Sequence, residues 1–259
     1  MLPKCDIGIR ALLVRVMLIV LALGLVPESR VDAREKSSVP VRHSPVTQAA
    51  PDPMRHPAAR DARFGDVWQP SSLGTVDADV FNLALGAANC AVRSGAVENP
   101  STLTVIDYSK PSTEKRLWVY DLRTHELLYE ELVAHGQGSG GNLATAFSNE
   151  PDTHRTSLGL FVTEDTYVGK NGYSLRLDGL DRGFNDRARD RAIVMHGAPY
   201  VSEEFAHAQG RLGRSWGCPA LSEDVARPLI DRVKGGGLVF SYYPDQEWLK
   251  TSKFFSCHN

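Results

Sequence analysis

The sequence lacks an excess of either charge sign. Its 259 residues hold 29 Lys and Arg against 31 Asp and Glu, a formal net charge of −2. Nucleic acid is therefore not an expected partner, because domains that bind it commonly carry a basic excess. Charged residues make up 23% and hydrophobic residues 42% of the chain. These values are ordinary for a globular protein, and the length suits one sizeable core.

Long apolar runs are scarce as well. One run of eleven residues, 16–26, follows three basic residues and precedes the segment Val31-Asp32-Ala33. This layout predicts a secretory signal peptide over residues 1–33, and hence export. Eleven residues are short for a membrane span, which needs about 20. The alternative is an uncleaved anchor, in which case the chain meets the membrane only through this segment.

Motifs for phosphate and metal binding are missing. The glycine-rich segment 136–142 lacks the Lys-Ser/Thr ending of a phosphate loop, so nucleotide binding is only weakly supported. A zinc site built from His196, His207 and Cys218 is conceivable, but the spacing matches no common ligand pattern. We expect neither a metal nor an organic cofactor.

Cysteine is sparse, with four residues in the chain. Cys5 is lost if the signal peptide is removed, which leaves Cys90, Cys218 and Cys257. An odd number in an exported protein suggests one free, reactive thiol. The simplest division is a disulfide between Cys90 and Cys257 with Cys218 free. The alternative is that Cys90 and Cys257 are two unpaired structural thiols.

The first part of the chain divides into a tether and a helix. Residues 34–70 are rich in Pro, Ser, Ala and Arg without an apolar period, which predicts a flexible tether, or a pro-segment or disordered tail. In residues 77–97 apolar side chains recur at three- and four-residue steps, which predicts a helix. We expect an N-terminal helical segment over 71–99 that packs on a second domain formed by 100–259.

The pattern after Pro100 changes to strands. A polar turn at 122–125 separates two of these strands and predicts a hairpin. A further helix is predicted over 223–233. Many short strands with few helices indicate a mainly-β sandwich or barrel with peripheral helices. The predicted strands are 103–108, 116–121, 126–134, 158–163, 174–177, 192–196 and 238–243.

The motif Ser215-Trp216-Gly217-Cys218-Pro219 follows Met195-His196-Gly197 by about twenty residues. A thiol is a good nucleophile only as thiolate, and a nearby imidazole is the usual activator near neutral pH. If the two meet, the chain is a cysteine acyl-transfer enzyme. The N–H groups of Gly217 and Cys218 are then expected to face one developing oxyanion. The alternative is that Cys218 is a buried structural cysteine.

His196 ends an apolar run and is the predicted general base and later general acid, because the ordinary imidazole pKa lies near 6.5. His207 is the competing base, although its surroundings are more typical of a surface residue. His135 and His154 flank the glycine-rich segment, and we expect them to lie outside the cleft. A papain-like protease places its cysteine before its histidine, the reverse of the order here.

With these residues in view, the stretch from Ser157 to Tyr243 resembles the L,D-transpeptidase catalytic domain with its YkuD-like fold, in particular a murein L,D-transpeptidase-like subfamily. Weaker similarity extends back to about residue 77. The resemblance implies a YkuD-like β-sandwich. It also implies a cysteine nucleophile and a peptidoglycan stem peptide as donor. The matching pieces are Ser174-Leu175-Arg176-Leu177, Gly179-Leu180-Asp181, Asn185-Asp186, 191–197, 210–215 and Trp216-Gly217-Cys218-Pro219.

The same resemblance implies roles for the site residues. Cys218 attacks the L-centre carbonyl of a tetrapeptide stem and expels the terminal D-residue, while His196 activates the thiol. The carbonyl of Gly197 orients the imidazole, and Ser215 falls on the motif serine or threonine. The acyl-enzyme is then resolved by an amine acceptor or by water.

The chain departs from the family pattern at two positions. Trp216 replaces the second histidine of Ser/Thr-His-Gly-Cys, and Ala220 replaces a polar residue, which leaves the exact substrate and acceptor open. Trp216 and Tyr200 are predicted substrate contacts. Three arginines are predicted to bind stem-peptide carboxylates, since a guanidinium pairs with a carboxylate in bidentate fashion; the alternative is that they are ordinary surface residues. They are Arg214, Arg211 and Arg176.

The sequence leaves three candidate functions. The first is an exported L,D-transpeptidase-like enzyme of the cell wall, with the periplasm as its expected location. The second is an L,D-carboxypeptidase or another cysteine hydrolase of the cell envelope. The third is a catalytically inactive wall-binding protein, against which the presence of both Cys218 and His196 argues.

Overall fold

The computed structural model describes residue 64 and residues 68–257. The predicted signal peptide and most of the predicted tether lie outside these residues, so both stay predictions. Within the described ranges, no helix combines the length and apolar composition that crossing a membrane requires.

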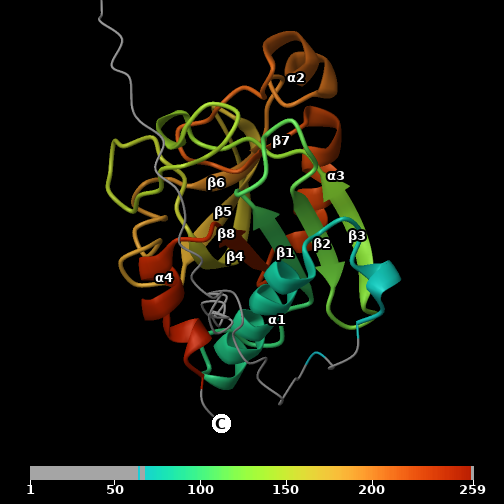
Figure 1. The fold of residues 1–259 in the computed structure, drawn as a ribbon, viewed down its shortest axis with the longest axis vertical. Coiled ribbons are helices and arrows are strands. Elements are labelled where there is room, and N and C mark those ends of the chain that lie inside the picture. The colour runs from blue at the N-terminus through green and yellow to red at the C-terminus, as the bar shows by residue number, and fades with distance from the viewer. Residues whose placement is uncertain (1–63, 65–67, 258–259) are drawn as a thin grey trace, which may run out of the picture. The chain divides into compact units, whose positions relative to one another are not determined.

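Eight strands form one sheet in the order β3-β2-β1-β8-β4-β5-β6-β7 (Figure 1). The pairs β1–β8 and β6–β7 are parallel and the other neighbours are antiparallel. The mainly-β class with peripheral helices is confirmed. The strands are β1 (Thr102–Asp107), β2 (Leu117–Asp121), β3 (Glu126–Glu131), β4 (Gly159–Gly169), β5 (Gly172–Gly179), β6 (Val194–Gly197), β7 (Ala220–Leu221) and β8 (Leu238–Tyr242).

Four α-helices accompany the sheet in the described part of the chain. They are α1 (Ala78–Arg93), α2 (Glu203–Gln209), α3 (Glu223–Val233) and α4 (Gln246–Thr251). The carboxylate of Asp77 accepts hydrogen bonds from the N–H groups of Asp79 and Val80, which caps the first turn of α1. Three short 3-10 helices complete the list, at Pro70–Ser72, Gln137–Ser139 and Lys253–Phe255.

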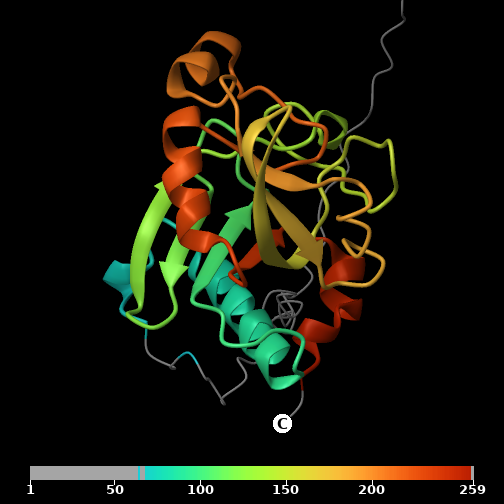
Figure 2. The same ribbon diagram turned by 180° about the vertical axis from the view of Figure 1, so that it is seen from behind.

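The middle of the sheet is buried on both faces. Alternate residues of a strand point to opposite faces, so Leu103 and Val105 of β1 join one apolar cluster and Ile106 joins another. α1 and α4 cover the first face, and α3 covers the second (Figures 1 and 2). This double cover explains why all six residues of β1 are buried.

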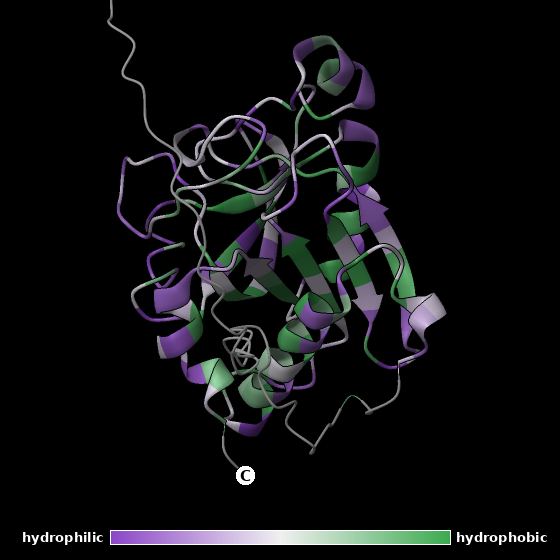
Figure 3. Cartoon of the chain, in the orientation of Figure 1, coloured by the Kyte–Doolittle hydropathy of each residue, from purple (hydrophilic) through white to green (hydrophobic). Residues whose placement is uncertain are grey.

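Hydropathy follows the position of each strand in the sheet. β1 lies between β2 and β8 and carries hydrophobic residues in its middle, whereas the edge strand β3 carries hydrophilic residues at its ends (Figure 3). The glutamates Glu126, Glu130 and Glu131 of β3 are exposed or half-buried. Charges on an edge strand discourage pairing with another chain.

Some elements exceed what the local pattern predicted. β4 extends to Gly169, and α4 and the two-residue strand β7 were not predicted. A strand as short as Ala220–Leu221 has no readable alternation, because its structure depends on its partner. It exists because it pairs with β6, with Ala220 opposite His196.

A disulfide joins Cys90 of α1 to Cys257 near the C-terminal end, with the two Cα atoms 5.7 Å apart. It closes a loop across a sequence separation of 167 residues. A cross-link of this kind stabilises chiefly by restricting the unfolded chain.

We expect the double variant Cys90→Ala/Cys257→Ala to lose roughly 2–4 kcal/mol of unfolding free energy. Urea unfolding of the purified protein measures this loss. The control is the wild type under a reducing agent, which should approach the stability of the variant. An unchanged midpoint in the double variant would show that the cross-link does not stabilise the fold.

Candidate active site

The parallel pairing of β6 with β7 places His196 and Cys218 on neighbouring chain segments. His196 lies opposite Ala220, and Cys218 precedes Ala220 by two residues. The backbone N–H of Val194 donates to Cys218 Sγ at 3.5 Å, which ties the thiol to the start of β6. Both side chains are nearly buried, at 4% exposure for His196 and 7% for Cys218.

The imidazole of His196 is fixed by its neighbour. Its Nδ1 lies 2.8 Å from the carbonyl oxygen of Gly197, which is the place that the resemblance implies for this carbonyl. Because a carbonyl can only accept, Nδ1 carries the proton and Nε2 keeps its lone pair. Burial lowers the pKa of His196, and the hydrogen bond to Gly197 opposes this shift. The resting imidazole is therefore neutral and able to accept a proton.

Cys218 is the free cysteine among the described residues. Its thiol donates to the carbonyl of Ala192 at 3.8 Å, and within the described ranges no hydrogen bond joins it to His196. Burial raises the pKa of Cys218, while the Val194 N–H and the charge of Arg191 oppose the rise. The resting pair is thus a neutral thiol beside a neutral imidazole rather than an ion pair.

The Ala192 carbonyl belongs to a strained backbone. Ala192 has a φ of +52°, a left-handed conformation that is uncommon for a residue with a Cβ. Such strain tends to occur at functional sites. Arg191, just before it, donates to the carbonyls of Ser148 and Arg155 at 2.7 and 2.6 Å. Sequence reasoning gave Arg191 no role, although it stands five residues before His196.

Ser215 holds the turn that carries Cys218. Its hydroxyl accepts from the N–H of Gly217 at 3.1 Å and donates to the carbonyl of Cys218 at 2.6 Å. This differs from the expectation that the Gly217 N–H faces an oxyanion, because that donor is already occupied. Gly217 has a φ of +116°, and a Cβ there would lie 2.7 Å from the Arg155 oxygen, so only glycine fits.

A second backbone segment, which contains His135 and Gln137, is hydrogen-bonded to this turn. The N–H of Ser215 donates to the carbonyl of His135, and the N–H of Gln137 donates to the carbonyl of Ser215. Arg116, fully buried, donates to His135 Nδ1 at 2.8 Å and to the carbonyl of Val133. Burial, aided by the Arg116 charge, lowers the pKa of His135 to about 4, so His135 stays neutral. His135 is thus buried and supports the cysteine turn through its backbone carbonyl.

Trp216 lies at the surface beside Cys218 and is 67% exposed. Its indole stacks on the imidazole of His154, with ring centroids 4.7 Å apart and an interplanar angle of 9°. The ammonium of Lys170 lies over the same indole, 5.9 Å from its centroid. His154 was expected outside the cleft. That expectation stays a prediction, and the structure places the His154 ring against a residue of the cysteine motif.

The other residues predicted for the site are Tyr200 and three arginines. Burial, and then the neighbouring Cys218 sulfur, raise the pKa of Tyr200 to about 12. Arg214 donates to the carbonyl of Gly140 at 2.8 Å, and Arg211 to the carbonyl of Leu212. Arg176 of β5 pairs with Val194 and lies over the ring of Tyr167.

His207 is exposed in the last turn of α2. Among the residues that the structure describes, no group of three or more His, Cys, Asp or Glu side chains is placed to hold a metal ion.

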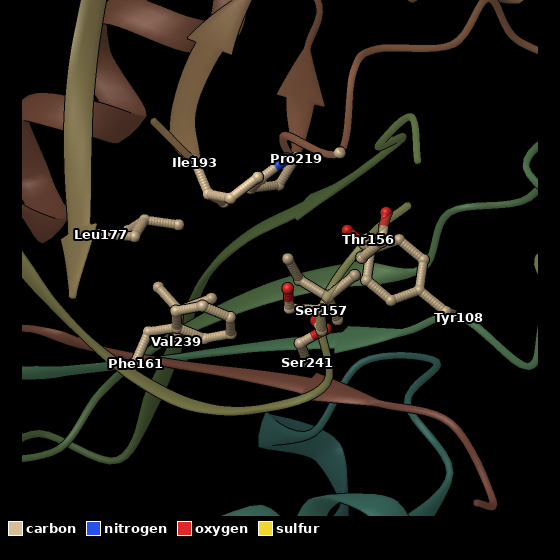
Figure 4. Close-up of a pocket in the computed structure, with 11 residues that line it drawn as sticks. Tyr108, Thr156, Ser157, Phe161, Leu177, Ile193, Pro219, Val239 and Ser241 are labelled. Atoms are coloured by element: carbon tan, nitrogen blue, oxygen red, sulfur yellow. The ribbon is translucent and has the colours of Figure 1, made fainter. Parts of the chain in front are cut away.

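A cavity of about 10 Å³ lies against both neighbours of Cys218, Gly217 and Pro219. Its size suits about one water molecule. Figure 4 shows the serine and threonine hydroxyls of the lining gathered opposite the apolar side chains. The rest of the lining is Ile106, Tyr108, Thr156, Ser157, Phe161, Leu177, Ile193, Val239 and Ser241.

Alkylation of Cys218 by iodoacetamide should accelerate at a higher pH in the folded than in the urea-unfolded protein. Burial raises the thiol pKa in the folded state, and only the thiolate reacts. Mass spectrometry of the peptide that contains Cys218 gives the rate at each pH. A folded curve displaced to lower pH would instead indicate a resting thiolate paired with His196.

The sequence model of the L,D-transpeptidase catalytic domain family matches residues 73–242 of this chain. An L,D-transpeptidase from Mycobacterium smegmatis is 17% identical, with 55% of this chain and 59% of that chain covered and a TM-score of 0.35. An L,D-transpeptidase from Stackebrandtia nassauensis is 16% identical, with 63% of this chain and 68% of that chain covered and a TM-score of 0.34. The helical cell shape determining protein Pgp2 from Campylobacter jejuni is 13% identical, with 58% of this chain and 50% of that chain covered and a TM-score of 0.37.

The chain covers 58%, 59% and 49% of the length of the first three solved structures that it matches. No curated protein matches it. The family model, by contrast, spans more than half of the 259 residues and contains both His196 and Cys218. The chain therefore belongs to the L,D-transpeptidase catalytic domain family.

Proposed function

We propose that this protein is an exported cysteine acyltransferase that acts on peptidoglycan stem peptides. The observation that carries the proposal is a free, buried Cys218 thiol tied to the strand of His196, with the imidazole fixed by the Gly197 carbonyl. Both residues lie in the segment that the family model matches. The family acts on peptidoglycan stem peptides, and this substrate class is proposed for the chain.

In the first half-reaction, Cys218 Sγ attacks the L-centre carbonyl carbon of a tetrapeptide stem. The thiol proton passes to Nε2 of His196, and the terminal D-residue leaves as an amine that takes this proton back. The thiol must first turn from the Ala192 carbonyl toward the imidazole. Of the two donors expected for the oxyanion, Gly217 N–H is bonded to Ser215, so Cys218 N–H is the one proposed to bind it.

In the second half-reaction, an acceptor amine or water attacks the thioester. His196 accepts the proton of the nucleophile, and the Cys218 sulfur leaves and is reprotonated. An amine gives transpeptidation and water gives carboxypeptidase trimming, so the two functions share the same acyl-enzyme. The arginines Arg211 and Arg214 are half-buried, and each bonds to a backbone carbonyl. They are proposed to contact stem carboxylates with their remaining N–H groups.

The proposed location is the periplasm or another exported compartment. It is supported by the predicted signal peptide and by the Cys90–Cys257 disulfide, since disulfides persist in oxidising compartments.

The decisive test is mass spectrometry after incubation with tetrapeptide muropeptides. We expect loss of the terminal D-residue and a thioester adduct on Cys218, and both should vanish in Cys218→Ala. His196→Ala should slow the adduct by about 100-fold or more, because the general base is lost. Dimeric products that appear only with an amine acceptor separate transfer from hydrolysis. Full turnover in folded Cys218→Ala would overturn the mechanism.

Ser215→Ala tests the clamp on the cysteine turn. Removal of the hydroxyl leaves the Gly217 N–H without its acceptor and should slow acyl-enzyme formation by about tenfold, the effect of one net hydrogen bond. Ser215→Thr keeps the hydroxyl and should retain most of the rate. Equal rates in the alanine and threonine variants would show that the hydroxyl does not position Cys218.

A further inference from the structure

Trp216 presents an open aromatic face next to the nucleophile. Of the four tryptophans, Trp118 and Trp248 are fully buried and Trp68 is half-buried, whereas Trp216 is 67% exposed. The parallel imidazole of His154 covers one face of its indole. The exposure therefore belongs to the opposite face and the edges. A large aromatic ring left open beside a reactive site is typical of a recognition surface.

The aromatic pair is held firmly in place. His154 Nδ1 lies 2.8 Å from the Gln137 side-chain nitrogen, and the His154 carbonyl accepts from the N–H of Gly138. The N–H of Gln137 in turn donates to the carbonyl of Ser215, the residue before Trp216. The two stacked rings thus belong to segments that are bonded to each other. A platform already rigid before binding saves the ligand part of the ordering cost.

The rim of this platform is polar and cationic. Lys170, in the turn between β4 and β5, lies over the indole, and Arg155 and Gln137 beside the stack are exposed. A cation over an exposed ring is held weakly, so a ligand can displace the ammonium to the edge of the ring. The surface then offers a flat apolar floor surrounded by hydrogen-bond donors.

We propose that the open face of Trp216 binds a pyranose ring of the glycan strand that carries the donor stem peptide. A saturated sugar ring presents several C–H groups on one flat face, which match the π face of an indole. Its hydroxyl and acetamido groups lie at the ring edge, where Lys170 and Arg155 can bind them. The cationic rim also suits a glycan whose attached stem peptides carry carboxylates.

This inference rests on the proposed function and makes it more specific. The resemblance places a histidine where this chain has Trp216, so the platform distinguishes this chain from the family pattern. With Trp216 only two residues from Cys218, a sugar on the platform would hold its stem peptide near the thiol. The enzyme should therefore prefer stems attached to sugar over free stem peptides.

The first experiment measures binding without turnover. Glycan strands stripped of their stem peptides are titrated into the full-length Cys218→Ala variant, followed by tryptophan fluorescence and by calorimetry. We expect a saturable emission change. The calorimetric affinity should fall by about tenfold in Cys218→Ala/Trp216→Leu and remain in Cys218→Ala/Trp216→Phe. The matched control is Cys218→Ala/Leu143→Ala, at another large exposed apolar residue, which should bind as Cys218→Ala does.

Two outcomes would contradict sugar binding at Trp216. If a free tetrapeptide changes the emission and the stripped glycan does not, or if Trp216→Leu leaves the glycan affinity unchanged, the platform does not bind sugar. The second experiment compares acylation of Cys218 by tetrapeptide and by disaccharide-tetrapeptide. Trp216→Leu should bring the ratio of the two rates close to one, while Leu143→Ala keeps the wild-type ratio.

The two experiments separate the inference from the function beneath it. Acylation by a tetrapeptide without glycan binding would overturn the sugar platform and leave the proposed function intact. Glycan binding without any acylation of Cys218 would overturn the proposed function and leave the sugar platform intact.

Discussion

The parallel pairing of β6 with β7 is the constraint on which the site depends. Two backbone partners, His196 with Ala220 and Gly197 with Leu221, fix the distance between the imidazole strand and the cysteine turn. A slip of one residue would turn His196 to the other face of the sheet, because strand side chains alternate. The Ser215 hydroxyl and the carbonyl of His135 hold the turn in this register. Buried Arg116, which binds His135, supports that second segment.

Burial sets the chemistry of the pair. It lowers the pKa of His196 and raises that of Cys218, so each favours its neutral form. A neutral imidazole can take a proton and a neutral thiol can give one. In the proposed mechanism, proton transfer accompanies attack on the substrate, when the imidazolium charge is balanced by the developing oxyanion. The Val194 N–H and the charge of Arg191 limit how far the pKa of the Cys218 thiol rises.

The glycine-rich segment 136–142 also finds a physical explanation. A Cβ on Gly136 would lie 2.3 Å from the carbonyl oxygen of His154, and one on Gly138 would lie 2.2 Å from that of Thr153. Three backbone segments meet here without room for side chains: this loop, the stretch before β4 and the cysteine turn. Gly136 and Gly138 serve close backbone packing, and this packing accompanies the stacking of His154 on Trp216.

The sequence by itself determined what depends on local pattern and composition. The periodicity of 77–97 predicted α1, a helix over 223–233 was also predicted, and many short strands with few helices predicted the mainly-β class. The odd number of cysteines after the predicted signal peptide singled out Cys218, and the motif around His196 singled out its proposed partner. Those roles stay predictions. Tertiary structure decided what depends on residues far apart in the chain. It set the existence of β7, the Ala192 carbonyl that holds the thiol, and the stack of His154 on Trp216. No local pattern encodes these contacts, because each partner has an ordinary sequence environment until the sheet brings the two together.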